Sequence, residues 1–215
     1  MAIRPVYIVS EKKPYYKIEN IEFKFYTGFS KTQKQKSIKS LHSEYNNLHK
    51  EKRILEISTK SSNLLGIQLS AFNLLITTSN RQFSVENAFQ SSKIFENGGP
   101  YTELLMEKPG KAKRDIRLRE SGKLIAFEYF GIRFPLEPKD YFYNWLYVNT
   151  LNLNKKLAKE ILQYDSFSDI EFNPKKSINC QAKAAAIFVG LNRQELLDEA
   201  LESKKNFLRI VYGIK

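Results

Sequence analysis

The chain has 215 residues, 42% of them hydrophobic and 27% charged, which is ordinary for a globular protein with one well-packed domain. No apolar run approaches the ~20 residues of a membrane span. A single cysteine excludes an internal disulfide and, with two histidines, makes no zinc site, so neither a metal nor another cofactor is expected. The net charge of +12 favours a polyanionic partner, either nucleic acid or a phosphorylated ligand, although a basic surface without a dedicated partner explains it equally well. The first residues lack the cleavage pattern of a secretory signal, so we expect a cytoplasmic protein.

The N-terminal part combines an alternating segment with a basic one. Residues 5–26 are rich in aromatic and β-branched side chains, and Ile21, Phe23 and Phe25 alternate with charged neighbours, which predicts a half-buried strand. Residues 30–53 are rich in lysine, and their apolar side chains recur at helical spacing at Ile38, Leu41, Tyr45 and Leu48. This pattern predicts an amphipathic helix whose basic face either binds an anion or is simply solvated.

The rest of the chain mixes short strands with helices. Strands are predicted at residues 53–58, 72–77 and 124–130. Helices are predicted from Ser84 to a stop at Gly98–Pro100, over 111–120, from Tyr141 onward, and over 181–190, where the composition indicates burial. Asn192 and Glu195 match a capping box for the last helix. Because strands come early and helices dominate the C-terminal half, the sequence indicates an α+β fold.

The most informative segment is FSVENAFQSSKIFENGGP at residues 83–100. Ser84 is a good helix N-cap. In a helix over 84–95, at ~100° per residue, Glu86, Gln90 and Lys93 fall within roughly 60° of one another beside an apolar stripe. An ordinary surface helix with an acid, an amide and a base on one face is the alternative, but Glu86 and Lys93 are too far apart in sequence for the usual helix ion pair.

SVENAFQSSKIF at 84–95 resembles the signature of the NADAR (YbiA-like) family, Ser-x-Glu-x-x-x-Gln-x-x-Lys. LSAFN at 69–73 and KAKRDIR at 111–117 resemble two other family segments in the same order, although Asp115 or Ile116 stands where a glycine is usual. The NADAR proteins encoded beside DarT-type toxins are similar over further segments at 25–42, 55–61, 96–105, 142–147 and 172–191. Two features depart from the general family: its downstream tryptophan has no clear counterpart, since the GIRFP segment shows Phe134 there, and SINCQAK replaces its Asp-x-x-Trp-Gly ending.

The resemblance implies a single NADAR-like catalytic domain over residues 61–215, with residues 1–60 as a subgroup-specific extension packed on it. It implies that the protein is a hydrolase of N-glycosidic bonds that removes ADP-ribose from guanine in single-stranded DNA. ADP-ribose would be the product, and the protein would act as the antitoxin to a DarT-type ADP-ribosyltransferase toxin. Two alternatives are hydrolysis of ribosyl pyrimidine phosphates of the riboflavin pathway and non-catalytic binding of ADP-ribosylated nucleic acid or of the toxin. The basic N-terminal segment favours the larger anionic substrate.

The residue types suit this chemistry. The amine of Lys93 is suited to a Schiff base with ribose C1 if burial lowers its pKa, and Glu86 is suited to general acid–base work. In the other route, Glu86 stabilises an oxocarbenium-like centre and Lys93 acts only as a charge.

The expected ligands of ADP-ribose offer cations for the pyrophosphate, rings for stacking and polar groups near the pocket: Ser84, Gln90, Lys111, Lys113, Arg114, Arg117, Tyr143, Trp145, Asn179 and Gln181. The expected DNA contacts are Ser30, Gln33, Lys34, Lys36 and Ser37. Part of the cationic cluster is equally consistent with a solvated helix face, and an aromatic pair such as Tyr143 and Trp145 is more often core.

Overall fold

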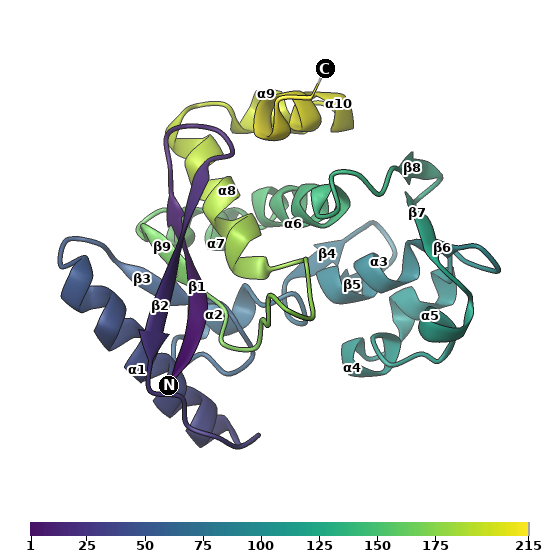
Figure 1. The fold of residues 1–215 in the computed structure, drawn as a ribbon. Helices are drawn as coiled ribbons and strands as arrows, with labels where there is room; N and C mark the ends of the chain where they lie inside the picture. Colours follow the sequence, from purple (N-terminus) through teal and green to yellow (C-terminus); the bar gives the residue numbers. More distant parts are fainter. Residues whose placement is uncertain (215) are drawn as a thin grey trace.

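The computed structural model describes residues 1–214. Its largest sheet joins three strands from the N-terminal part of the chain with one strand from the C-terminal half. β1 (Ala2–Val9) and β2 (Tyr16–Phe23) form an antiparallel hairpin. β9 (Ser166–Ser168) pairs antiparallel with β1 and parallel with β3 (Ile54–Glu56), so the strand order is β2-β1-β9-β3 (Figure 1). The first 60 residues therefore supply three of the four strands of this sheet.

Helices cover both faces of this sheet. α1 (Lys31–Leu48) packs on β2, and its buried Leu41 and Tyr45 belong to one hydrophobic cluster with Val6 of β1. α8 (Gln181–Arg193) packs against β1 and β9, where Tyr7 belongs to the main hydrophobic core. Because successive strand residues point to opposite faces, Val6 and Tyr7 enter different clusters. The alternation predicted for β2 is confirmed. The amphipathic pattern predicted for α1 is confirmed at Ile38, Leu41 and Tyr45, whereas Leu48, at the end of the helix, is exposed.

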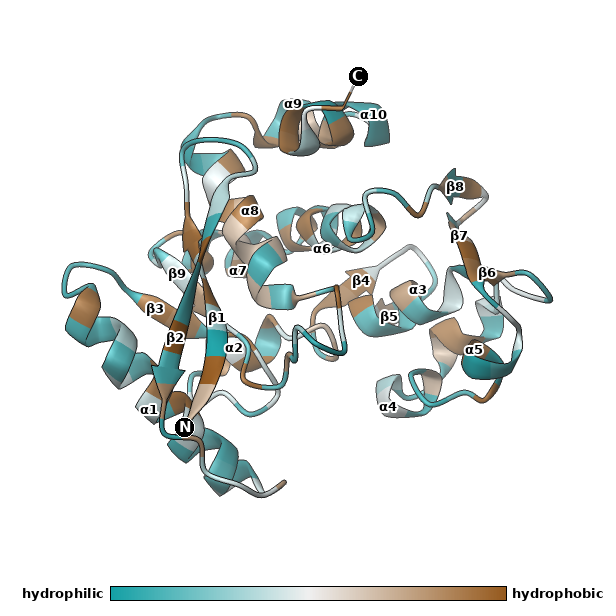
Figure 2. Cartoon of the chain, viewed as in Figure 1, coloured by the Kyte–Doolittle hydropathy of each residue, from teal (hydrophilic) through white to brown (hydrophobic). Residues whose placement is uncertain are grey.

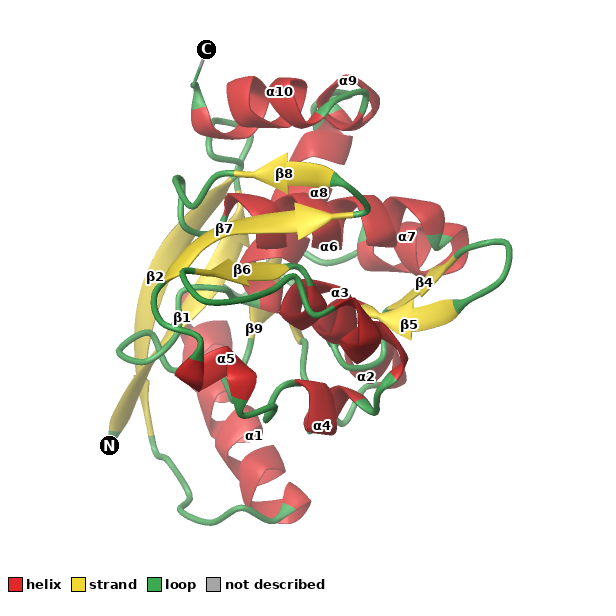
Figure 3. Cartoon of the chain, turned by 90° about the vertical axis from the view of Figure 1, so that its right-hand side faces the viewer, coloured by secondary structure: helices red, strands yellow, loops and turns green. Residues whose placement is uncertain are grey.

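Two smaller antiparallel sheets lie beside this unit, next to the helices that follow them (Figures 1 and 3). One pairs β4 (Leu75–Thr77) with β5 (Gln82–Ser84), and the other has the order β6-β7-β8, with bounds Lys93–Phe95, Leu124–Tyr129 and Ile132–Phe134. The remaining helices are α2 (Leu64–Gln68), α3 (Val85–Ser91), a 3-10 turn (Thr102–Met106), α4 (Pro109–Ala112), α5 (Arg117–Glu120), α6 (Tyr141–Leu153), α7 (Lys155–Ile161), α9 (Leu197–Leu201), α10 (Lys204–Phe207) and a π turn (Leu208–Tyr212). The α+β class and its early strands are thus confirmed.

Hydropathy separates the packed elements from the connections. β3, β7 and α8 are mainly hydrophobic, whereas the connection that precedes α8 is mainly hydrophilic (Figure 2). Every residue of α8 from Ala184 to Leu191 is buried, which confirms the buried helix expected there. Among residues 1–214, no helix combines the length and the apolar character needed to cross a membrane.

The helix expected over 84–95 is shorter than predicted. α3 ends at Ser91, and Lys93 begins strand β6, which pairs with β7. The hydroxyls of Ser91 and Ser92 both donate to the carbonyl oxygen of Ala88, at 3.1 and 2.7 Å. Serine hydroxyls compete in this way with the backbone ladder of a helix, and this competition coincides with the exit of the chain into a strand.

Two other local predictions are also corrected. The helix expected over 111–120 is split into α4 and α5, because Asp115 turns back to accept a hydrogen bond from the backbone N–H of Arg117 at 3.0 Å. The capping box at Asn192 and Glu195 is absent: Asn192 still belongs to α8, Glu195 has a φ of 56°, and α9 begins only at Leu197. The left-handed backbone at Glu195 ends one helix rather than starting the next.

Gly66 allows a close contact between α2 and β3. A Cβ at this position would lie 2.0 Å from the carbonyl oxygen of Glu56 and 2.6 Å from Oγ of Ser61. Gly66→Ala is therefore expected to lower the free energy of unfolding by about 1–3 kcal/mol, measured by chemical denaturation. Gly110→Ala is the matched control, because the nearest atom there is a terminal nitrogen of Arg114 at 3.8 Å. Equal stability of the two variants would contradict this account of Gly66.

Candidate active site

A cleft of about 970 Å³ lies between α3 with its neighbouring segments and the connection from β9 to α8. Its volume is that of a site for a nucleotide-sized ligand. Glu86, Phe89, Gln90 and Lys93 line one wall, and Asp169 lies on the segment that follows β9. The pairing of β9 with β1 and β3 therefore positions one wall of the cleft, while α3 and β6 position the other (Figure 1).

A hydrogen-bonded chain connects the acid, the amide and the amine on the α3 wall. Nζ of Lys93 donates to Oε1 of Gln90 at 2.7 Å, and Nε2 of Gln90 donates to Oε1 of Glu86 at 2.9 Å. Glu86 and Gln90 are each only 5% exposed. The i,i+4 spacing on α3 brings Glu86 to Gln90, whereas the chain turn after Ser92 brings Lys93 to them. The predicted grouping of these side chains is present, although Lys93 is not on the helix.

Burial shifts the pKa of Lys93 to about 8 from its ordinary value of 10.5. Desolvation is the main cause, the negative charge of Glu86 opposes it, and the positive charge of Lys113 adds to the lowering. The amine lies over the ring of Phe89, 4.9 Å from its centroid, and Phe89 packs on Phe127. With this pKa a far larger fraction of the amine is free at pH 7 than in an ordinary lysine. Lys93 is thus suited to act as a nucleophile.

Ser84 and Asn87 hold α3 in place. Oγ of Ser84 accepts from the backbone N–H of Asn87 at 3.1 Å, which confirms Ser84 as the N-cap. The side-chain amide of Asn87 donates to the carbonyl oxygens of Leu104 and Glu107 at 2.7 and 2.6 Å. These bonds fasten the start of α3 to the segment before α4. The hydroxyl of Ser84 serves the helix cap, and Ser84 does not line the cleft.

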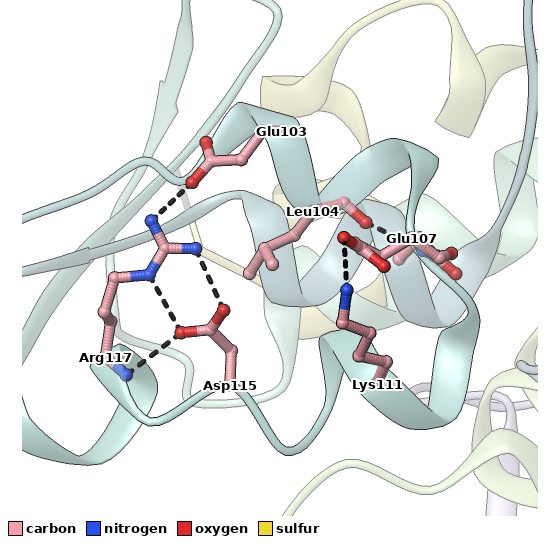
Figure 4. Close-up of polar contacts among 7 residues, drawn as sticks. Glu103, Leu104, Glu107, Lys111, Asp115 and Arg117 are labelled. Carbon is pink, nitrogen blue, oxygen red and sulfur yellow. Dashed lines mark hydrogen bonds and ion pairs between the residues drawn. The ribbon is translucent and has the colours of Figure 1, made fainter.

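Two cations of the basic segment around α4 and α5, Arg117 and Lys111, are paired with acids outside the cleft (Figure 4). Arg117 forms two bonds of 2.9 Å with the carboxylate of Asp115, a further ion pair with Glu103, and lies 4.4 Å from the ring centroid of Tyr101. Its hydrogen bonds hold the pKa of Asp115 below the usual value. Lys111 pairs with Glu107 at 2.8 Å. Lys111, Arg114 and Arg117, all predicted ligands of ADP-ribose, are not among the residues that line the cleft.

Lys113 is the member of that segment that was both predicted as a ligand and lines the cleft. Its Nζ lies 3.6 Å from Oε1 of Glu86 and 5.3 Å from the ring centroid of Phe72. Arg119 of α5 lines the cleft as well but was not predicted. Because the chain between α4 and α5 turns, Lys113 and Arg119 reach the cleft while Arg117 is held by its acids.

The other predicted ligands divide between the cleft and the core. Tyr143, Asn179 and Gln181 line the cleft. The amide of Gln181 is already bonded to the backbone of Ala71 and Ile57, at 2.7 Å each, so it holds the wall together. Trp145 is outside the cleft and packs on Phe134, with ring centroids 4.8 Å apart.

Sequence reasoning missed several residues of the cleft that can meet an ionic or aromatic ligand. They are Phe72, Arg119, Lys139, Asp169, Asn173 and Lys176. Asn173 and Lys176 lie in NPKKSIN, a polar run before a buried helix, and that run was a usable signal for a pocket wall. Nothing local distinguishes Lys139 from other exposed lysines.

The predicted DNA contacts lie at the start of α1, and none of them lines the cleft. Ser30 is the exposed N-cap and accepts from the backbone N–H of Gln33 at 3.2 Å. Lys34 lies 5.4 Å from the ring centroid of Phe25, and Lys36 is exposed. Ser37 is fully buried and bonded to the backbone of Tyr26, so its side chain is not at the surface.

Comparison with known proteins identifies the family of this chain. A search of curated proteins gave no match. The chain does match the family described as the DarT1-associated NADAR antitoxin, over residues 2–215. That match includes both walls of the cleft and all strands of the large sheet. The protein therefore belongs to the DarT1-associated NADAR antitoxin family.

Proposed function

We propose that this protein is an N-glycosidase that removes ADP-ribose from guanine bases of single-stranded DNA and so reverses the modification made by a DarT-type toxin. The observation that carries the proposal is the buried chain from Lys93 through Gln90 to Glu86. It places an amine with a pKa of about 8 beside a carboxylate in a cleft of nucleotide size. Family membership supplies the antitoxin role.

The charges of the cleft suit a nucleoside diphosphate sugar. Lys113, Arg119, Lys139 and Lys176 line it, and cations of this kind bind pyrophosphate oxygens. Phe72 and Phe172 give apolar surface for a base. A sequestering module would need the cations and rings but not the buried acid–amide–amine chain, which favours catalysis over binding alone.

The mechanism follows from the two reactive groups. As the ribose ring opens, the C1–O4 electron pair moves to the oxygen, which takes a proton, and the nitrogen of the base forms a double bond to C1. The free amine of Lys93 adds to C1. The base leaves with a proton and the electron pair of its bond to C1, and water then hydrolyses the lysine Schiff base to free ADP-ribose. Glu86 is placed to give and take protons at the ribose.

The direct test incubates the protein with a guanine-ADP-ribosylated single-stranded oligonucleotide and measures released ADP-ribose. Borohydride added during turnover is expected to trap a ribose adduct on Lys93, located by peptide mass spectrometry. Faster turnover of a ribosyl pyrimidine phosphate than of the oligonucleotide would overturn the DNA substrate. No adduct, together with an active Lys93→Arg variant, would exclude the Schiff-base route and leave Lys93 as a charge.

The rate of adduct formation is expected to rise with pH and to level off above about 8. The reason is that the attacking species is the free amine of Lys93, whose pKa is lowered to about 8 by burial. The measurement is the yield of borohydride-trapped protein at short times from pH 6 to pH 10. A rise that continues toward the ordinary lysine value would show that Lys93 is not desolvated during the reaction.

Affinity for modified DNA is expected to fall with salt, because Lys34 and Lys36 are proposed to bind backbone phosphates. Each phosphate contact to a single strand contributes about −0.7 to the slope of log K against log salt. The variants Lys34→Gln and Lys36→Gln are each expected to reduce that slope by roughly one contact. An ADP-ribosylated mononucleotide is the control, because it lacks the strand. An unchanged slope would move the DNA path away from α1.

A further inference from the structure

Asp169 stands out among the residues of the cleft because the proposed mechanism does not use it. It directly follows β9 and lines the cleft. Its side chain is more than nine-tenths buried, with 8% exposed. The chain places it there through β9, which is held between β1 and β3.

The two carboxyl oxygens of Asp169 have different surroundings. Oδ1 accepts from the backbone N–H groups of Glu171 and Phe172 at 3.0 and 3.2 Å. Oδ2 accepts no hydrogen bond from any of residues 1–214, yet it is not a fully buried atom. Because Asp169 lines the cleft, the accessible Oδ2 is the oxygen that faces it. The oxygen that faces a ligand is therefore the one free to carry a proton.

A second carboxyl lies behind Asp169. Glu56 of β3 is 2% exposed, and both its oxygens accept: Oε2 from the hydroxyl of Ser168 at 2.5 Å and Oε1 from the backbone N–H of Ile170 at 2.9 Å. Burial raises the pKa of Glu56, and the hydrogen bonds from Ile170 and Ser168 lower it. Because both oxygens of Glu56 already accept hydrogen bonds, Asp169, with its free Oδ2, is the carboxyl of the pair that can hold a proton. Desolvation first, and then the charge of Glu56, raise the pKa of Asp169 well above its usual value.

The backbone N–H groups of Glu171 and Phe172 lower the pKa of Asp169 through their hydrogen bonds, and the charge of Glu171 raises it. The charge of Asp169 in turn raises the pKa of Cys180 before α8, of Tyr7 of β1, and of Tyr143 and Tyr147 of α6. None of these is a cation that would hold Asp169 ionised. Burial raises the pKa of Tyr143, and the charges of both Glu86 and Asp169 raise it further, so the tyrosine is near enough to feel both carboxyl groups.

We propose that Asp169 is a further catalytic residue, a neutral carboxylic acid whose Oδ2 protonates the leaving base. As the C1–N bond breaks, its electron pair stays on the nitrogen, and the proton of Asp169 completes the N–H bond of the free base. C1 forms its new bond to the amine of Lys93, and water later replaces that bond. The proton that this water loses restores the acid, so the cycle consumes water alone.

This assignment rests on the proposed function and divides the work between two carboxyl groups. Glu86, bonded to Gln90 beside Lys93, serves the ribose side. Asp169, on the opposite wall, serves the base. Two carboxyl groups in different surroundings are a usual arrangement for an acid and a base in one site.

The test compares two substrates that differ in their leaving group. Guanine-ADP-ribosylated DNA releases an amine that needs a proton, whereas a 4-nitrophenyl ADP-ribose releases a phenolate that needs none. Asp169→Asn keeps the Oδ1 acceptor and the side-chain volume, so the segment after β9 retains its bonds. We expect this variant to lose roughly 10²–10³-fold in rate on the DNA and less than about tenfold on the aryl substrate.

Two further variants sharpen the result. Glu171→Gln removes a charge that raises the pKa of Asp169 less than the charge of Glu56 does, so it is expected to keep the ratio of the two rates at neutral pH. Glu56→Gln removes the charge behind Asp169, so the pKa of Asp169 falls and the loss of rate on DNA at high pH begins at a lower pH. The aryl substrate should show no such shift.

Equal losses on both substrates in Asp169→Asn, or no loss on either, would overturn the role of Asp169 while leaving the proposed function intact. A wild-type protein that cleaves the aryl substrate but releases no ADP-ribose from the DNA would overturn the proposed function and the role of Asp169 with it. The release of ADP-ribose from the DNA by the wild-type protein therefore distinguishes failure of the proposed function from failure of the role of Asp169.

Discussion

Lys93→Met is expected to reduce the release of ADP-ribose from modified DNA by at least roughly 10³-fold, because it removes the proposed nucleophile and leaves only binding and acid–base groups. Methionine has a similar length and is apolar, so it suits the surface of Phe89 beneath the amine. Loss of the charge also removes the cost of desolvating it. We therefore expect a stable protein without activity.

The measurement is single-turnover release of ADP-ribose together with the thermal midpoint. Lys159→Met is the matched control, because Lys159 is exposed on α7 and does not line the cleft. It should retain the wild-type rate. A Lys93→Met protein that still neutralised the toxin in cells would favour sequestration of the modified DNA over catalysis.

Glu86→Gln is expected to lower turnover by roughly 10²–10⁴-fold, the usual contribution of a general acid–base group. It also has a signature in pH. The charge of Glu86 raises the pKa of Lys93 against desolvation, so its removal should bring the pKa of Lys93 below about 8. Adduct formation in this variant should therefore reach its plateau at a lower pH than in the wild type, even though turnover is slower.

Glu103→Gln is the control for this change, since Glu103 pairs with Arg117 away from the cleft (Figure 4). Both variants should be compared for trapping by borohydride across the pH range and for turnover at one pH. If Glu86→Gln lowered turnover without moving the pH dependence of trapping, the acid would not be electrostatically coupled to Lys93, and the chain through Gln90 would have no chemical role.

Much of the local structure could be predicted from the sequence because it depends on neighbours in the chain. The alternation of Ile21 and Phe23 defines β2, and the apolar spacing in α1 defines its buried face. Glu86 and Gln90 share a helix face for the same reason. Helical spacing predicted that Lys93 lies beside Gln90, and it does. The predicted secondary structure of Lys93 was wrong, however, because this residue begins strand β6.

The second wall of the cleft could not be predicted in this way. Asp169 reaches it only because β9 pairs with strands more than a hundred residues earlier, and no local pattern encodes such pairing. The prediction that the basic cluster at 111–117 binds phosphate was inaccurate for a different reason. Residue type identified Arg117 as a phosphate ligand, but Asp115 two residues away already binds its guanidinium. That competition is local, so an acid two residues from an arginine indicates that the guanidinium can be paired within the chain rather than with a ligand.

The position of β9 between β1 and β3 also bears on when the protein can work during its own synthesis. One edge of β1 pairs with β9, so it stays unpaired until residues 166–168 have been synthesised. The face of the sheet that α8 covers stays exposed until residues 181–193 follow. A chain still attached to the ribosome with its last fifty residues unmade, as roughly a few seconds of translation would leave it, lacks one entire wall of the cleft. An antitoxin of this topology therefore becomes competent only near the completion of each molecule, so newly made protein protects a cell after a delay set by the length of the whole chain.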